Sequence, residues 1–305
     1  MEQMSELSGA TALDTSLTAA NAEPAAIHRV LVVGAGTMGS GIAQVIAQAG
    51  IETTLTDADT AGLERGLEAI ASRWERLVRS GRFSAQDVAS FHAKLTSGTI
   101  ADSTRADLVI EAIVEKPEPK SALFEELAVM APPPSILASN TSSISISMLG
   151  RASGRPDRFL GLHFFNPVPV LPLVEIVRGI ETSEQTLATG VKFVEAISKI
   201  PIVVSDSPGF VANRILLPMI NEAIFALQDG VAPAKSIDEV MKLGMSHQMG
   251  PLALADLIGL DICLDILETL HRDFGDDKYR PAPMLRRIVG AGKLGRKTGQ
   301  GFYEY

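Results

Sequence analysis

Short apolar runs alternate with segments of helical periodicity from Arg29 to about residue 205. The run RVLVV, at 29–33, leads through a glycine-rich turn into a helical segment that ends at Gly50. Apolar runs of about four to eight residues bounded by turn residues are typical of buried strands. Because strands alternate with helices, we predict an α/β fold with a doubly wound, mainly parallel, Rossmann-like sheet. The expected strands are RVLVV, TTLTD, DLVIEAI, SILASN, FLGLHFF, LVEIV and IPIVV.

The alternation stops after the segment SDSPGF, at 205–210, and helical patterns follow it. We therefore predict a boundary near Pro208, with a Rossmann-like, NAD-binding domain at 28–208 and a smaller all-helical domain at 209–305. Further helices of the first domain are expected at 65–79, 85–95, 120–130 and 183–200. Those of the second domain are expected at 211–227, 236–243, 252–270 and 284–289.

The segment before the first strand differs from the rest in its charge. Residues 1–27 include Glu2, Glu6, Asp14 and Glu23 but no Lys or Arg. A secretory signal needs a basic start and a transit peptide is rich in Arg, so the segment matches neither. We predict a disordered acidic tail at 1–27 and cytoplasmic residence.

Composition narrows the classes of function. The chain of 305 residues is 46% hydrophobic and 21% charged, which is typical of a soluble globular protein, and its formal net charge is −9. An acidic protein repels polyanions, so we expect no nucleic acid and no membrane among its partners. Its single cysteine, Cys263, excludes an intramolecular disulfide and a Cys-based zinc cluster, and we predict no metal.

The glycine-rich turn carries the first candidate chemistry. Gly34, Gly36 and Gly39 form a G-x-G-x-x-G pattern between a strand and a helix, which is typical of dinucleotide binding. Asp57 closes the second strand, where a carboxylate accepts hydrogen bonds from a ribose 2′-OH and repels a 2′-phosphate. NAD is therefore favoured over NADP as the cofactor. The predicted cofactor contacts of this segment are Gly34, Gly36, Thr37, Met38, Gly39 and Asp57.

A second candidate lies in the segment GLHFFNPVPVLPLVEIV, which places His163 and Glu175 in apolar surroundings. Its prolines cannot continue a ladder, so they mark a connection between two strands. If these strands pair antiparallel about Pro169, His163 lies opposite Glu175, with Cβ atoms about 5 Å apart. A carboxylate at that range can orient an imidazole that acts as a general base. The alternative is a hydrogen-bonded core histidine beside a solvated glutamate.

At this point the chain resembles a known family, the L-3-hydroxyacyl-CoA dehydrogenases, and within it the short bacterial 3-hydroxybutyryl-CoA dehydrogenases. The matching blocks extend in order from about Val30 to Tyr305 and are VGAGTMGSGIAQ, EAIVE, ASNTSSISI, HFFNPVPVLPLVEIV, DSPGFVANRIL, MGPLALADLIGLD and GRKTGQGFYEY. The resemblance implies NAD-dependent oxidation of the 3-hydroxyl of an acyl-CoA. It also implies a homodimer that forms through the helical domain.

The resemblance implies roles for individual residues. His163 corresponds to the general base and Glu175 to its orienting partner, while Ser142 and Asn213 correspond to catalytic residues that contact the substrate. Asn166 corresponds to a residue near both the nicotinamide and the substrate. Structural alternatives are a helix N-cap for Ser142, a cap or interdomain bond for Asn213, and a solvated charge for Lys297. Further cofactor-side contacts are implied for Glu115, Lys120 and Lys297.

Three hypotheses of function follow from these patterns. The leading one is reversible oxidation of a short-chain (S)-3-hydroxyacyl-CoA with NAD, the (S) configuration being implied by the resemblance. The second is a 3-hydroxyacid dehydrogenase whose substrate carries no CoA. The third is a protein that binds NAD without catalysis.

Overall fold

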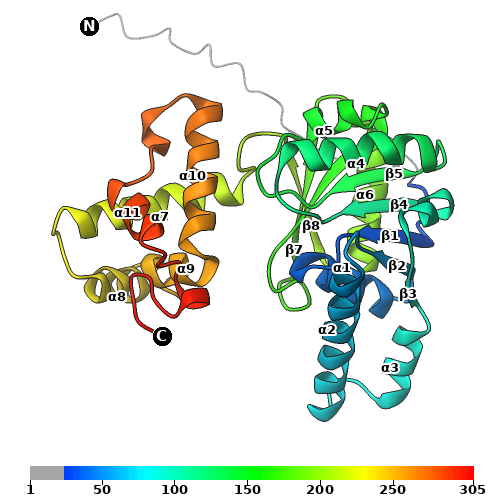
Figure 1. The fold of residues 1–305 in the computed structure, drawn as a ribbon, viewed down its shortest axis with the longest axis horizontal. Coiled ribbons are helices and arrows are strands. Elements are labelled where there is room, and N and C mark those ends of the chain that lie inside the picture. Colours follow the sequence, from blue (N-terminus) through cyan, green and yellow to red (C-terminus); the bar gives the residue numbers. More distant parts are fainter. Residues whose placement is uncertain (1–23) are drawn as a thin grey trace, which may run out of the picture.

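The computed structural model describes residues 24–305, and in them eight strands form a single sheet (Figure 1). The strand order is β3-β2-β1-β4-β5-β6-β7-β8, and all neighbours are parallel except β6 and β7. The predicted mainly parallel, Rossmann-like sheet is thus confirmed. The strands span Arg29–Val33 (β1), Glu52–Thr56 (β2), Leu95–Ser97 (β3), Leu108–Glu111 (β4), Ile136–Ser139 (β5), Phe159–Phe164 (β6), Leu173–Arg178 (β7) and Ile200–Ser205 (β8).

Helices cover both faces of the sheet and continue alone after β8, as predicted (Figure 1). The helices of the first part are Thr37–Gln48 (α1), Thr60–Arg79 (α2), Ala85–His92 (α3), Pro117–Met130 (α4), Ile146–Ala152 (α5) and Glu184–Ala196 (α6). Those of the second part are Ala212–Gln228 (α7), Ala234–Gly244 (α8), Pro251–Ile258 (α9), Leu260–Phe274 (α10) and Pro283–Gly290 (α11). Short 3-10 helices span Ile100–Arg105 (η1), Pro156–Arg158 (η2), Asp277–Tyr279 (η3) and Arg296–Thr298 (η4).

The central strands are buried on both faces, which explains their almost wholly apolar sequences. In β1, Val30 and Val32 pack into one hydrophobic cluster with residues of α1, α2 and α6. Leu31 and Val33 point the other way, into a second cluster with residues of α4 and α5. Successive side chains of a strand alternate between faces, so each strand contributes to both clusters. The result is a helix–sheet–helix sandwich of three layers.

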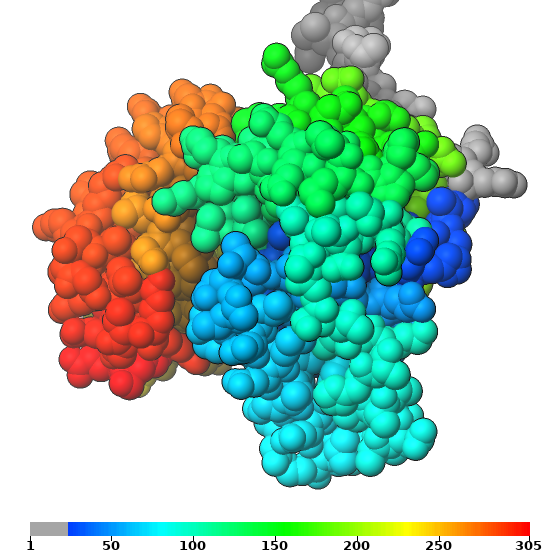
Figure 2. Space-filling model, turned by 45° about the vertical axis from the view of Figure 1, so that its right-hand side comes forward, coloured from blue at the N-terminus to red at the C-terminus, as the bar shows by residue number. Residues whose placement is uncertain are grey.

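The helical part has a hydrophobic core of its own, built from residues of α7, α9, α10 and α11. It lies beside the sheet, at the end of the molecule where Figure 1 shows β7 and β8. Figure 2 shows the two parts as lobes that meet along one side, while the α2–α3 segment projects at the bottom of the view. No helix among the described residues combines the length and the apolar character needed to cross a bilayer.

Several predicted elements need correction. The helix expected at 252–270 is two helices, because Gly259 adopts φ +107°, which a helix interior does not allow. The helix expected at 85–95 ends at His92, and Leu95 begins strand β3. Strand β3 and helix α5 have no counterpart in the prediction. Both are too short, at 3 and 7 residues, to show a periodic pattern.

The described part of the predicted N-terminal tail contacts the sheet domain. The Ala25 backbone N–H donates a hydrogen bond of 3.0 Å to Thr189 Oγ1 of α6, and Ile27 packs against the first cluster. Ordered structure thus begins before residue 28. Residues 1–23, on which most of the tail prediction falls, lie outside the described part of the chain.

Candidate active site

The sheet register brings the predicted site segments to one edge. Val33 of β1 pairs with Glu111 of β4, Glu111 with Ser139 of β5, and Ser139 with Gly161 of β6. Because these strands are parallel, the segments that follow them leave the sheet on the same side. The glycine loop, the SNTSS segment and His163 therefore lie along one edge, at the carboxyl ends of the strands.

The glycine loop is shaped by contacts that exclude side chains. Gly34 has φ +105°, and a Cβ there would lie 2.5 Å from the Ala112 carbonyl oxygen. A Cβ on Gly39 would lie 1.7 Å from the Gly34 carbonyl oxygen, so α1 can start this close to β1 only with glycine there. Gly36 is different, since no atom lies within 4 Å of its Cβ position and the residue is exposed. The structure thus leaves room at Gly36 for a ligand to approach the backbone.

Asp57 follows β2 and supports this loop directly. Its Oδ2 accepts a hydrogen bond of 2.7 Å from the Ala35 backbone N–H, and its Oδ1 accepts one of 2.9 Å from the Asp59 N–H. Helix α1 begins at Thr37, and its N-terminal N–H groups favour an anion. A glycine loop at a helix N-terminus, beside a carboxylate and an open Gly36, fits a dinucleotide.

The antiparallel pairing of β6 with β7 has the predicted register, with His163 directly opposite Glu175. His163 Nδ1 lies 2.7 Å from Glu175 Oε2, and both residues are buried. A carboxylate only accepts hydrogen bonds, so Nδ1 donates, and in the neutral imidazole Nε2 then keeps a lone pair. The imidazole is also flanked by aromatic rings, with centroid distances of 4.5 Å to Phe165 and 5.7 Å to Phe210. The pair is therefore an oriented imidazole with one nitrogen able to accept a proton.

The proline-rich connection between β6 and β7 packs against α1, the helix that follows the glycine loop. Lys199 Nζ donates hydrogen bonds of 2.6 Å to the Val168 carbonyl and 2.7 Å to the Leu171 carbonyl. Val168 packs closely on α1, since a Cβ added at Gly41 would lie 3.0 Å from the Cβ of Val168. Burial lowers the pKa of Lys199. The sequence analysis did not predict that Lys199 holds this connection, because the contact depends on which loop lies next to β8.

The second oxygen of Glu175 reaches the helical part. Glu175 Oε1 accepts hydrogen bonds from the backbone N–H groups of Val211, at 3.3 Å, and Ala212, at 3.0 Å, where α7 begins. Phe210, just before them, is buried with φ +49°, a conformation uncommon for a bulky residue. Asn213 Nδ2 donates a hydrogen bond of 3.1 Å to the Ser142 carbonyl. Two bonds to Glu175 and one to Ser142 thus link the start of α7 to the sheet domain. The bond of Asn213 is the interdomain bond that was one alternative for this residue.

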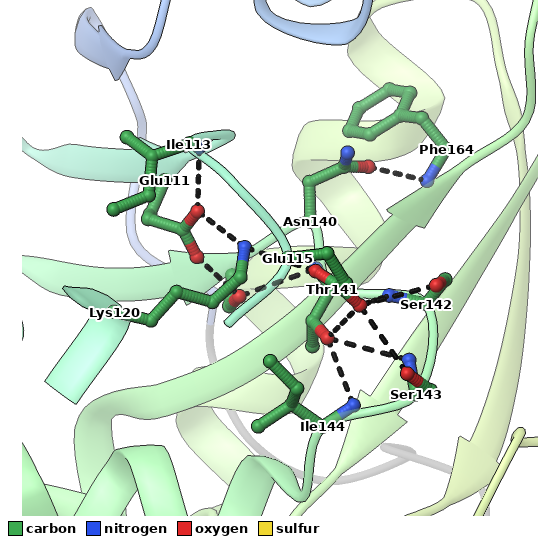
Figure 3. A network of polar contacts seen from close by, with 11 residues as sticks. Glu111, Ile113, Glu115, Lys120, Asn140, Thr141, Ser142, Ser143, Ile144 and Phe164 are labelled. Carbon is green, nitrogen blue, oxygen red and sulfur yellow. Dashed lines mark hydrogen bonds and ion pairs between the residues drawn. The ribbon is translucent and has the colours of Figure 1, made fainter. Parts of the chain in front are cut away.

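Ser142 lies in a dense polar network around Glu115 (Figure 3). Glu115 Oε1 accepts hydrogen bonds from Thr141 Oγ1, at 2.6 Å, and from the Ser142 backbone N–H, at 2.7 Å. The Ser142 hydroxyl lies 3.1 Å from the same oxygen. Helix α5 is capped by the Ser145 side chain, so Ser142 is not its N-cap. Burial raises the pKa of Glu115, but the Lys120 ammonium and these hydrogen bonds outweigh it and hold the pKa below its ordinary value.

Lys120 lies behind Glu115, between two carboxylates. Its Nζ is 2.5 Å from Glu111 Oε1 and 3.2 Å from Glu115 Oε2, and its side chain is 1% exposed. A direct contact of Lys120 with the cofactor stays a prediction. Glu111 was missed in the sequence, although a glutamate that closes the buried strand LVIE is a signal of a paired charge.

The remaining predicted residues occupy different places. Asn166 is exposed just after β6. Lys297, in η4 of the helical part, forms an ion pair of 2.5 Å with Asp261. Asn140 was not predicted, and its Oδ1 accepts a hydrogen bond of 2.9 Å from the Phe164 N–H, which fixes the end of β5 to the end of β6 (Figure 3).

Comparison with known proteins connects this geometry with a family. Residues 29–207 match the model of the 3-hydroxyacyl-CoA dehydrogenase NAD-binding domain, and residues 209–305 match that of the C-terminal domain. The chain belongs to the 3-hydroxyacyl-CoA dehydrogenase family. The family resemblance expected from the sequence is confirmed, and this 3-hydroxyacyl-CoA dehydrogenase is an oxidoreductase with NAD as its cofactor.

Relatives of this family member are similar over nearly their whole length. A probable 3-hydroxybutyryl-CoA dehydrogenase of Bacillus subtilis is 49% identical, over 92% of this chain and 98% of its own. The 3-hydroxybutyryl-CoA dehydrogenase of Bradyrhizobium diazoefficiens is 47% identical, over 92% and 96%. The crystal structure of an (S)-3-hydroxybutyryl-CoA dehydrogenase from Ralstonia eutropha has a TM-score of 0.89 and 47% identity, over 92% of this chain and 99% of that one.

Proposed function

We propose that this protein catalyses the reversible, NAD-dependent oxidation of short-chain (S)-3-hydroxyacyl-CoA, such as 3-hydroxybutyryl-CoA, to 3-oxoacyl-CoA. The observation that carries the proposal is the buried His163–Glu175 pair, 2.7 Å apart, on the sheet edge that also holds the glycine loop. The relatives named for 3-hydroxybutyryl-CoA, at 47–49% identity, support the substrate.

The chemistry assigns separate tasks to the residues of this edge. His163 Nε2 takes the proton of the substrate 3-hydroxyl as the C3–H bond breaks, and Glu175 stabilises the imidazolium that forms. NAD, when bound, supplies the acceptor for the hydride that leaves C3. Ser142 and Asn213 hold the reacting oxygen, and Asn166 contacts both substrate and nicotinamide. In the reverse direction the imidazolium returns the proton.

The cofactor is held mainly by the loop between β1 and α1. Gly36 admits the pyrophosphate to the backbone, the start of α1 with Thr37 and Met38 faces it, and Asp57 binds the adenosine ribose. Glu115 and Lys297 complete the proposed cofactor side, and Lys120 supports it from behind Glu115. In this proposal residues 28–208 form the cofactor domain, and residues 209–305 complete the substrate site.

We also propose a homodimer formed through the helical part, in the cytoplasm. Large apolar side chains stay exposed there, and a second copy would remove them from water. Sedimentation equilibrium should give twice the chain mass, and Leu243→Glu on α8 should shift the protein toward monomer. Val129→Glu, an equally exposed position on α4, is the control and should leave the mass unchanged. The exposed large apolar residues of the helical part are Val211, Ile215, Val231, Val240, Leu243, Met245, Leu257, Ile262 and Tyr305.

The test of the activity is NADH formation measured with 3-hydroxybutyryl-CoA and with free 3-hydroxybutyrate. We expect turnover of the CoA ester, and a loss of about 10²- to 10⁴-fold in kcat for His163→Gln. His271→Gln, on the exposed end of α10, is the matched control and should retain wild-type rates. Turnover of the free acid alone, or of neither compound, would contradict the proposal. Full activity of His163→Gln would contradict only the assigned base.

A further inference from the structure

A buried ion pair at the end of β4 has no explanation in the packing of the sheet. Glu111 is 0% exposed and Lys120 is 1% exposed, and their charged atoms lie 2.5 Å apart. Removal of two charges from water is costly, and well-packed apolar residues of the same size often stabilise a fold equally well. The three residues before Glu111 in β4, Leu108, Val109 and Ile110, are apolar and buried, so a charge at the fourth position departs from the pattern of the strand. This pair therefore has a use other than stability.

The pair is anchored firmly at its Glu111 end. Glu111 Oε1 also accepts a hydrogen bond of 2.7 Å from the Ile113 N–H (Figure 3). Its Oε2 accepts one of 2.6 Å from Ser139 Oγ on the neighbouring strand. Ser139 Oγ in turn accepts a bond of 3.2 Å from the Thr141 N–H. The position of the Lys120 ammonium is thus set by two adjacent strands, and it does not depend on Glu115.

Glu115 is the partner that depends on Lys120. Its side chain is 38% exposed, lies in the segment after β4, and meets the ammonium through Oε2 at 3.2 Å. The other oxygen, Oε1, receives Thr141 Oγ1, the Ser142 N–H and the Ser142 hydroxyl. Lys120 therefore fixes one end of this carboxylate, and the other end fixes Ser142.

The direction of the Ser142 hydrogen bond has a chemical consequence. An ionised Glu115 only accepts, so the Ser142 hydroxyl donates its single hydrogen to it. A substrate hydroxyl that gives its proton to His163 can only accept a hydrogen bond from Ser142. The hydrogen of Ser142 must then leave Glu115 for the substrate oxygen. The bond from the Ser142 hydroxyl to Glu115, at 3.1 Å, is longer than the bonds from Thr141 Oγ1 and from the Ser142 N–H. When the hydroxyl turns away, Glu115 keeps these two shorter bonds.

We propose that the buried Glu111–Lys120 pair positions Glu115 and, through it, Ser142, whose hydroxyl turns from Glu115 to the substrate oxygen during the reaction. Glu111 and Lys120 are positioning residues in this scheme, and it rests on the proposed function. Lys120 draws charge toward Oε2, so Glu115 holds the Ser142 hydrogen less strongly and releases it to the substrate.

The test is a double-mutant cycle on kcat at saturating substrate and NAD. The variant Glu111→Gln/Lys120→Met removes the pair without leaving an unpaired charge in the β4 strand. It should lower kcat about tenfold when Ser142 is present and less than about twofold in a Ser142→Ala background. Glu111→Gln alone, which keeps the shape of the side chain, is measured in the same way and should show a smaller loss of the same kind.

The control removes an exposed pair of the same type, Lys192→Met/Glu195→Gln on α6, whose atoms are 3.0 Å apart, and should leave kcat unchanged. NADH affinity, from fluorescence titration, separates an effect on the cofactor from one on Ser142. Equal losses in both backgrounds, or none in either, would overturn the inference while the wild-type protein stays active. An inactive wild-type protein would overturn the proposed function and this inference with it.

Discussion

Replacement of Glu175 by Gln tests the orientation of His163 with little change in shape. In the wild-type protein Oε2 accepts from His163 Nδ1, while Oε1 accepts from the N–H groups of Val211 and Ala212. A glutamine keeps its Oε1 on these two donors, so its amide nitrogen faces the imidazole. That nitrogen donates, so His163 Nδ1 must accept and Nε2 must carry the hydrogen. The imidazole then presents the wrong tautomer to the substrate.

The size of the effect follows from the charge that is lost. Attraction between an imidazolium and a carboxylate about 4 Å apart is about 4 kcal/mol at an effective dielectric constant of about 20. Since about 1.4 kcal/mol corresponds to a factor of ten, loss of this attraction slows the proton-accepting step about 10³-fold. The tautomer change acts in the same direction.

The assay is kcat for NADH formation at saturating 3-hydroxybutyryl-CoA and NAD. Glu175→Gln should lose about 10³-fold in kcat and keep its affinity for NADH, because three strands separate β7, which carries Glu175, from β1, which leads into the glycine loop. Glu195→Gln, an exposed glutamate on α6, controls for the loss of one negative charge and should behave as wild type. A Glu175→Gln enzyme within about tenfold of the wild-type rate would refute this reasoning, provided that its melting temperature is unchanged.

Three further predictions concern the cofactor loop and the buried thiol. Gly39→Ala should weaken NADH binding more than about tenfold in a fluorescence titration, since its Cβ would lie 1.7 Å from a carbonyl oxygen, while Gly244→Ala should bind normally. Asp57→Ala should lower kcat/KM for NAD about tenfold and so reduce the ratio of kcat/KM for NAD to kcat/KM for NADP. An unchanged ratio would contradict the contact between Asp57 and the ribose. Burial raises the pKa of Cys263 to about 12 from 9.0, so at pH 8 the native thiol should resist Ellman's reagent until guanidinium is added. Because the unfolded thiol ionises first, the free energy of unfolding should fall as pH rises above 9.0, and Cys263→Ala should make this slope shallower.

The β6–β7 hairpin shows which part of the site can be predicted from sequence. Its partners are close in the chain, and the prolines between them locate the reversal at Pro169. Two strands that pair antiparallel around a fixed midpoint have one register, which places His163 against Glu175. The glycine loop is similar, because its strand, turn and helix are consecutive. The His163–Glu175 pair and the dinucleotide-binding loop could therefore be predicted because each is formed by segments that are close in the sequence.

The Glu115 network shows what sequence reasoning could not reach. Glu111 and Ser139 are 28 residues apart and meet only because β4 and β5 are neighbours in the sheet. Sequence gives strands but not their order, so the burial of Lys120 and its two carboxylates was not foreseen. Lys199 is a comparable case, since its partners Val168 and Leu171 lie in a loop that β8 happens to approach.

The first turn of α7 unites the two halves of the proposed site. The N–H groups of Val211 and Ala212 bind Glu175, which orients His163, and Asn213 binds the carbonyl of Ser142. The positions of the base and of the residue that holds the reacting oxygen thus both depend on where one helix begins. Because α7 belongs to the core of the helical part, the supports of Glu175 and of Ser142 come from the same packed unit. The proposed proton transfer therefore relies on three hydrogen bonds that the start of α7 makes to the sheet domain.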